Sequence, residues 1–312
     1  MRIVIILIAI VLAAGIVIAF FLLPSLSPGG GGIVYVTTVH PAAEILKQVV
    51  GDRAEVVRLL SPTDSPHTYE PTPRDREKVE HATGLVYVAE DLDGWIARFP
   101  AKKKVELLKL LPPEFVLYMK EHHGEEGEEH GEVADPHFWT DPLAVKAILP
   151  NLVKALSELD PEGSEIYRAN AERFAAELDA LHEELSRTLE PVKGRPVILF
   201  HPSFQYLLKR YGLEMAGVIE EFPGKEASPR YIEEMKHLIQ SSGAKAVFTE
   251  PQLNPRPAEV VAEEAGVKLF LLDPLGGVEG RNTYADMLRY NAKILLEALR
   301  SVCSQSKQKI FP

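Results

Sequence analysis

Three polar side chains with metal-binding chemistry stand where buried apolar runs end. His201, Glu250 and Asp273 each end or directly follow such a run, and each is followed by proline. The carboxyl ends of parallel strands meet at one edge of a sheet, so we expect these groups along the same edge of one lobe. Proline fixes the backbone and removes a donor, which sets ligand geometry before an ion arrives. The pattern predicts a binding site on rigid backbone.

Two more imidazoles come from the first half of the chain. His67 and His137 both lie in proline-punctuated loops rather than on the apolar face of a helix. Three imidazoles and one carboxylate form a closed tetrahedral set that suits Zn²⁺, so we predict His67, His137, His201 and Asp273 as the ligands. Mn²⁺ is the second candidate ion, although it prefers a larger share of oxygen ligands.

Two further residues compete for these roles. His40 ends the first predicted strand and is an alternative to His67, and Glu250 is an alternative to Asp273. Their loop contexts are less distinctive, so Glu250 is interpreted as a hydrogen-bond partner near the site rather than as a ligand. The histidines predicted to be ordinary surface residues are His81, His182 and His237.

Residues 121–132 differ in kind from the rest of the chain. They hold six glutamates and three histidines (His122, His123 and His130) with glycines and no apolar side chain. Such a composition predicts a mobile, solvated loop. It is either only that, or a low-affinity metal collector, since each ion bound there would have to order the chain.

Eight short apolar runs place these groups in an α/β fold. The runs read as strands of parallel sheets that are buried on both faces, and helical patterns separate them. We predict two lobes, each with a four-stranded, mainly parallel β/α sheet. The predicted strands are residues 33–38, 55–60, 85–89 and 105–110 in the first lobe and 196–200, 213–219, 244–249 and 267–272 in the second.

A long amphipathic pattern joins the two halves. Apolar residues recur three or four apart between Pro161 and Leu189, and Asp160 before the proline is typical of a helix start. A helix of this length is interpreted as a rigid connector between the lobes, with an ordinary surface helix as the alternative. A ligand would then bind between the lobes.

The first residues read as a membrane segment. Residues 3–23 are uncharged and almost wholly apolar, and as a helix they would span about 31 Å, enough for a bilayer core. An uncleaved anchor is favoured over a cleaved signal, which would leave a secreted or periplasmic protein. The predicted organisation is an anchor or signal at 1–23, a flexible linker at 24–32, the first lobe at 33–158, the connecting helix at 159–190, the second lobe at 191–302 and a tail at 303–312.

Composition excludes several classes of protein. The 312 residues carry a net charge of −11, which argues against a nucleic-acid binder. Cys303 is the only cysteine, so neither an internal disulfide nor a site built from thiolates is available.

The body of the chain resembles the zinc- and manganese-specific class of solute-binding proteins that serve ABC importers. The resemblance covers residues 33–300. It rests on His-Thr-Tyr-Glu-Pro-Thr-Pro-Arg-Asp at 67–75, Asp-Pro-His-Phe-Trp at 135–139, Phe-His-Pro-Ser-Phe at 200–204 and Asp-Pro-Leu-Gly at 273–276. It implies an ion buried between two α/β lobes, with ligands at His67, His137, His201 and Asp273. Histidine at the third ligand position and a His/acid-rich loop are typical of the zinc members.

The resemblance also implies the function. We expect capture of Zn²⁺ at the extracytoplasmic face of the membrane and delivery to an ABC permease, by a monomer with no nucleic-acid partner. The chain departs from the class around Trp95 and lacks a cysteine for lipid attachment.

Two rival functions remain open at this point. A zinc hydrolase would keep one coordination position for water, and neither an H-E-x-x-H helix nor a G-x-S-x-G elbow is present, so we expect no enzyme. A metal-stabilised adhesin is compatible with an anchor, but no motif supports it.

Overall fold

The computed structural model describes residues 32–120, 132–220 and 229–300. One compact unit begins at Ile33. Within the described ranges no helix is both long enough and apolar enough to cross a bilayer. The predicted anchor, the tail and the three histidines of the acidic loop lie outside these ranges.

The first lobe holds a four-stranded parallel sheet in the order β2-β1-β3-β4. Val36 in the central strand β1 lies opposite Val57 on one side and Leu85 on the other. The four early apolar runs are therefore the four strands, as predicted. The elements of this lobe are β1 (Ile33–Thr37), α2 (His40–Val50), β2 (Ala54–Arg58), α3 (Pro73–His81), β3 (Gly84–Tyr87), α4 (Glu90–Asp93) and β4 (Lys104–Glu106).

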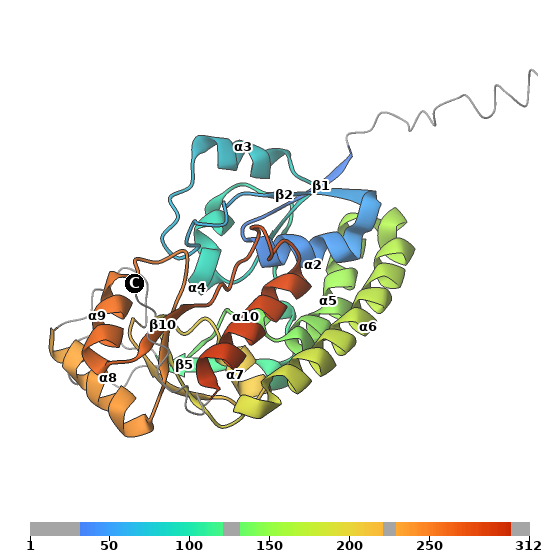
Figure 1. Ribbon diagram of the computed structural model, residues 1–312. Helices are drawn as coiled ribbons and strands as arrows, with labels where there is room; N and C mark the ends of the chain where they lie inside the picture. The colour runs from blue at the N-terminus through green and yellow to red at the C-terminus, as the bar shows by residue number, and fades with distance from the viewer. Residues whose placement is uncertain (1–31, 121–131, 221–228, 301–312) are drawn as a thin grey trace, which may run out of the picture. The chain divides into compact units, whose positions relative to one another are not determined.

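The second lobe repeats this design with the order β10-β9-β7-β8, again all parallel. Helices α8 and α9 lie beside each other against this sheet (Figure 1). The α/β class with two four-stranded sheets is confirmed. The elements are β7 (Pro196–Leu199), α7 (Gln205–Arg210), β8 (Glu214–Val218), α8 (Pro229–Ser242), β9 (Ala246–Thr249), α9 (Arg256–Ala265), β10 (Lys268–Leu271) and α10 (Tyr284–Leu299).

Two long helices lie between the sheets in the sequence and run side by side (Figure 1). They are α5 (Pro142–Leu159), which the sequence analysis did not identify, and α6 (Ser164–Leu189). The connecting helix begins later than predicted, because residues 161–163 form a 3-10 turn. Asp160 does not cap it: its carboxylate accepts hydrogen bonds from Arg53 at 2.8 and 2.9 Å and from the Tyr167 hydroxyl at 2.7 Å.

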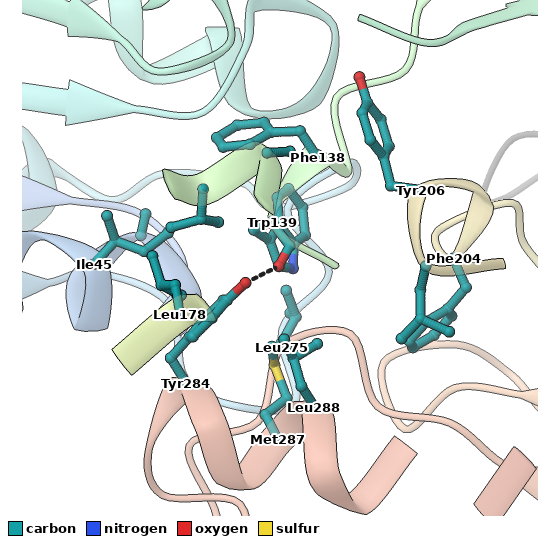
Figure 2. Close-up of a cluster of buried hydrophobic side chains, with 14 of the residues drawn as sticks. Ile45, Phe138, Trp139, Leu178, Phe204, Tyr206, Leu275, Tyr284, Met287 and Leu288 are labelled. Atoms are coloured by element: carbon teal, nitrogen blue, oxygen red, sulfur yellow. Dashed lines mark hydrogen bonds between the residues drawn. The ribbon is translucent and has the colours of Figure 1, made fainter. Parts of the chain in front are cut away.

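A continuous hydrophobic core joins the lobes. One cluster of buried side chains contains Tyr35 from β1, Leu178 from α6 and Phe248 from β9. Figure 2 shows part of it, in which Trp139 lies near Leu275. Burial of large apolar side chains is the main favourable term in folding, so this seam is a structural core rather than a loose contact between domains.

A small antiparallel hairpin brackets the acidic loop. Its strands are β5 (Tyr118–Lys120) and β6 (Glu132–Ala134), with Met119 opposite Val133. This pair was not predicted from the sequence, and the predicted loop extends to residue 132, which is the first residue of β6. The hairpin ends just before the loop that carries His137.

Candidate metal centre

Three imidazoles from both lobes converge at one point. One ring nitrogen from each of His67, His137 and His201 lies within 4.8 Å of the other two. Their ring centroids are 4.9 to 5.6 Å apart. Nitrogens bound to a tetrahedral zinc ion at 2.0–2.1 Å would be roughly 3.4 Å apart, so small shifts of the rings complete such a site.

The three rings line a small cavity. Its volume is about 20 Å³, and Glu250 and Gln252 also line it. A space of this size holds about one water-sized particle, which suits a single ion and excludes an organic substrate. A much larger groove of about 750 Å³ lies along α5 and α6, but none of the three histidines lines it.

His201 is positioned by the sheet itself. It lies two residues beyond the end of β7, and only 3 % of its surface is exposed. Its carbonyl oxygen accepts a hydrogen bond from the backbone N–H of Ser203 at 2.9 Å. The Ser203 hydroxyl in turn donates to Glu250 at 2.6 Å. This turn therefore ties the ligand at the end of β7 to the end of β9.

His137 is oriented by a carboxylate. Asp135 accepts hydrogen bonds from the backbone N–H of His137 at 2.9 Å and from its ring Nδ1 at 2.8 Å. Because a carboxylate accepts, Nδ1 holds the proton and Nε2 keeps its lone pair for an ion. The indole of Trp139 donates to the carbonyl oxygen of Pro274 at 2.7 Å, which fixes this loop against the second lobe.

His67 is held by its loop rather than by a strand. The Trp95 indole donates to the carbonyl oxygen of Pro66 at 3.0 Å, and its ring packs against Tyr69 with centroids 5.0 Å apart. Nε2 of His67 is buried and has no hydrogen-bond partner within the described ranges. Burial, with a smaller contribution from the nearby His137, lowers the pKa of His67 to about 3. This imidazole is therefore neutral and able to coordinate at any physiological pH.

Asp273, the predicted fourth ligand, lies at the end of β10 as expected. Among the described residues, however, the group within 4.8 Å contains the three histidines and not Asp273. Its Oδ1 accepts hydrogen bonds from the backbone N–H groups of Leu275 and Gly276, both at 3.0 Å, and from Gln252 at 3.2 Å. Its Oδ2 lies 3.0 Å from Nη1 of Arg281.

Glu250 lies beside the cavity as a buried hydrogen-bond partner. Burial is the main cause that raises its pKa to about 8, and the charges of Asp273 and Glu220 act in the same direction. The carboxyl group is thus largely protonated at neutral pH, in which form it is a poor ligand. The interpretation of Glu250 as a partner rather than a ligand remains a prediction.

The other histidines lie away from the cluster. His40, the alternative to His67, begins α2, and its Nε2 donates to the carbonyl oxygen of Asn282 at 3.0 Å. His81 and His237 are exposed, as expected of surface residues. His182 is half-buried and stacks on Tyr211, with ring centroids 5.6 Å apart.

Three side chains near the cluster were not assigned a role from the sequence. Asp135 stands two residues before His137, a spacing that signals an orienting carboxylate once the histidine is taken as a ligand. Trp95 and Arg281 are 28 and eight residues from the predicted ligands that they approach, His67 and Asp273. No local pattern in the sequence identifies them.

Comparisons with known proteins place the chain among zinc-uptake proteins. The sequence pattern of the family described as "Zinc-uptake complex component A periplasmic" matches residues 36–298. The chain is similar to the zinc-binding protein AdcA of Streptococcus pyogenes serotype M3, at 27 % identity over 90 % of this chain and 58 % of AdcA. It is also similar to the high-affinity zinc uptake system protein ZnuA of Brucella abortus, at 29 % identity over 86 % of this chain and 91 % of that protein.

The fold is likewise similar to a solved structure. A crystal structure of ZnuA superimposes with a TM-score of 0.74 at 29 % identity, covering 86 % of this chain and 99 % of the other. The chain thus spans nearly all of one relative but only 58 % of the length of AdcA.

Proposed function

The chain belongs to the zinc-uptake complex component A family of periplasmic binding proteins, and we propose that it captures Zn²⁺ outside the cytoplasm and delivers it to an ABC permease. The family is a component of an uptake complex and not an enzyme, in agreement with the expectation from the sequence. Members of this kind work with ABC permeases. That this chain serves such a permease, and that it does so as a monomer, is part of the proposal.

One observation carries the proposal: three imidazoles from two lobes, two of them buried and that of His67 partly buried, meet around a cavity the size of one ion. Imidazole is a preferred zinc ligand, and a site with three nitrogens favours Zn²⁺ over Mn²⁺. The Asp135 contact that orients His137 is the type of support that metal-binding histidines have in proteins.

Asp273 is proposed as the fourth ligand. It follows β10 at the same sheet edge at which His201 follows β7, and Pro274 and Leu275, which come next, line the cavity. With three neutral imidazoles and this carboxylate as ligands, the zinc ion and its ligands together would carry a net charge of +1. Coordination requires that Oδ2 turn from Arg281 toward the ion, while Oδ1 keeps its backbone donors.

The regions outside the described ranges enter the proposal from their composition alone. Residues 1–23 would anchor the protein at the extracytoplasmic face of the membrane, or would be cleaved as a signal. His122, His123 and His130 in the acidic segment would collect ions at low affinity. Release would occur by local loop rearrangement and modest tilting of the lobes, because the lobes share one core.

The test is a competitive titration of the purified protein with Zn²⁺ and Mn²⁺, with elemental analysis of the metal bound. We expect one tight zinc site per chain, and additional weak sites that disappear when residues 121–131 are deleted. Loss of the tight site on that deletion would contradict the assignment of the loop. Equal affinity for Mn²⁺ would contradict the assignment of zinc as the cargo.

A further inference from the structure

The carboxylate proposed as the fourth ligand already has a complete set of partners. Asp273 is 2 % exposed, and its Oδ1 accepts three hydrogen bonds. Its backbone is equally fixed, because the amide of Asn291 in α10 bonds both its N–H and its carbonyl oxygen at 2.8 Å. Oδ2 is instead paired with the end of a long side chain, the guanidinium of Arg281 at 3.0 Å, which can move away.

Arg281 is placed for such an exchange. Its Nη1 is buried and makes no well-formed hydrogen bond among the described residues, so the contact with Oδ2 is an ion pair held by charge rather than by geometry. The guanidinium carbon lies 4.5 Å from the centroid of the Tyr290 ring. A cation over an aromatic face retains favourable electrostatics, so Arg281 keeps a stable position when its carboxylate turns away.

We propose that Arg281 is a substitute cation: it neutralises Asp273 while the site is empty and is displaced from Oδ2 when the zinc ion binds. The inference rests on the proposed function, since it takes Asp273 as a ligand. A buried carboxylate without a counter-charge is costly, so Arg281 stabilises the empty protein. The same stabilisation lowers zinc affinity and speeds release, because the ion must compete with the arginine for one oxygen.

The loop that carries Arg281 contacts the first lobe. The carbonyl oxygen of Asn282 accepts a hydrogen bond from His40 at 3.0 Å. Gly277 has φ +79°, and a Cβ there would lie 2.6 Å from Nη1 of Arg58. Asp273 is fixed to α10 through Asn291, and its neighbour Pro274 accepts a hydrogen bond from Trp139 of the other lobe. Both partners of the ion pair therefore lie at the seam between the lobes.

The experiment measures zinc affinity and zinc dissociation rate in the full chain. Arg281→Gln removes the charge, and Arg281→Met removes it while keeping the aliphatic stem against Tyr290. Both variants are expected to bind zinc at least about tenfold more tightly and to release it correspondingly more slowly, as expected for loss of a buried competing charge. Arg281→Lys keeps a cation and should stay within about threefold of the parent.

The matched control is Arg256→Gln, which removes one exposed positive charge from the same lobe and should leave affinity unchanged. The Asp273→Asn background tests the coupling. In that background, the increase in zinc affinity caused by Arg281→Gln should fall below about threefold, because the zinc ion and the arginine no longer compete for a carboxylate.

The outcomes separate the role of Arg281 from the proposed function of zinc capture. Unchanged or weaker zinc binding in both charge-removing variants would overturn the role of Arg281. If Asp273→Asn leaves affinity unchanged while His201→Ala abolishes it, the substitute-cation role fails and capture by the three histidines stands. Tight zinc binding in His201→Ala would instead refute the proposed function itself.

Discussion

The two lobes position their predicted ligands by different means. In the second lobe, His201 and Asp273 each lie two residues beyond a strand, β7 and β10 respectively, so the sheet sets their positions. In the first lobe, His67 and His137 lie on long loops, and side chains such as Trp95 and Asp135 hold them in place. Ligands at strand ends are fixed by backbone pairing, whereas ligands on loops depend on a few hydrogen bonds that single substitutions can remove. Each experiment below compares these two kinds of support.

The largest effect is expected from loss of a ligand at a strand end. His201→Ala should weaken zinc binding by more than about 100-fold, since loss of a supporting group alone typically costs 10–100-fold. The apo fold should remain, because the sheet positions this residue rather than the reverse. Competition against a chelator of known affinity measures the effect. His237→Ala is the control, because this histidine of α8 is exposed. A loss below tenfold would show that β7 does not supply a ligand.

The carboxylate that supports a loop ligand should come next. Asp135→Asn keeps the shape of the side chain and an acceptor for the His137 backbone, but weakens the contact that fixes the ring tautomer. Zinc affinity should fall by about 10- to 100-fold. Asp179→Asn on α6 removes an equal charge at the surface and should have no effect. If both substitutions act equally, the general loss of negative charge is responsible, and not the orientation of His137.

The pH dependence should reveal how strongly the loop ligand is enclosed. Zinc requires neutral imidazole, and an ordinary histidine with a pKa of ~6.5 would cost about tenfold in affinity at pH 5.5. The pKa of His67 is lowered to about 3, so its neutral form persists and this factor is absent.

The decrease in affinity between pH 7.5 and 5.5 should therefore be about tenfold smaller than three ordinary imidazoles would give. Zinc titrations at the two pH values, with the chelator's own pH dependence subtracted, measure it. A decrease of about a thousandfold, the value for three ordinary imidazoles, would show that Nε2 of His67 is open to water.

The smallest effect should come from the indole that holds the His67 loop. Trp95→Phe removes the hydrogen bond to the Pro66 carbonyl oxygen but keeps a ring against Tyr69. One hydrogen bond contributes about 0.5–1.5 kcal/mol, so zinc affinity should fall by roughly two- to tenfold. Calorimetric titration at neutral pH is sensitive enough, and a loss above 100-fold would mean that the loop collapses without the indole.

The sequence was sufficient where the backbone alone determines position. The eight strands, the α/β class and the position of His201 follow from apolar runs and the groups that end them. The two loop histidines that converge with His201 were predicted from residue type, loop context and the family resemblance instead. The predicted start of α6 was too early because the Asp160 carboxylate does not cap the helix. It accepts hydrogen bonds from Tyr167 and from Arg53, which is 107 residues away in the sequence. Long-range side-chain pairing of this kind leaves no mark in a local pattern.

The same limit explains why the orientation of the predicted fourth ligand could not be foreseen. Asp273 has the position that the strand pattern predicts, but its carboxylate orientation depends on Arg281 and Gln252, which no spacing rule connects to it. The helix α5 escaped prediction for another reason. Pro150 interrupts its apolar pattern, and a proline inside a helix usually signals an end.

The core shared by the two lobes has a thermodynamic consequence. Since buried side chains of β1, α6 and β9 belong to one cluster, neither lobe can unfold without exposing the apolar surface of the other. The protein should therefore melt as one cooperative unit. An ion bound at the seam then stabilises both lobes together by mass action, so the resistance of this two-lobe unit to heat and proteases follows the free zinc concentration around it.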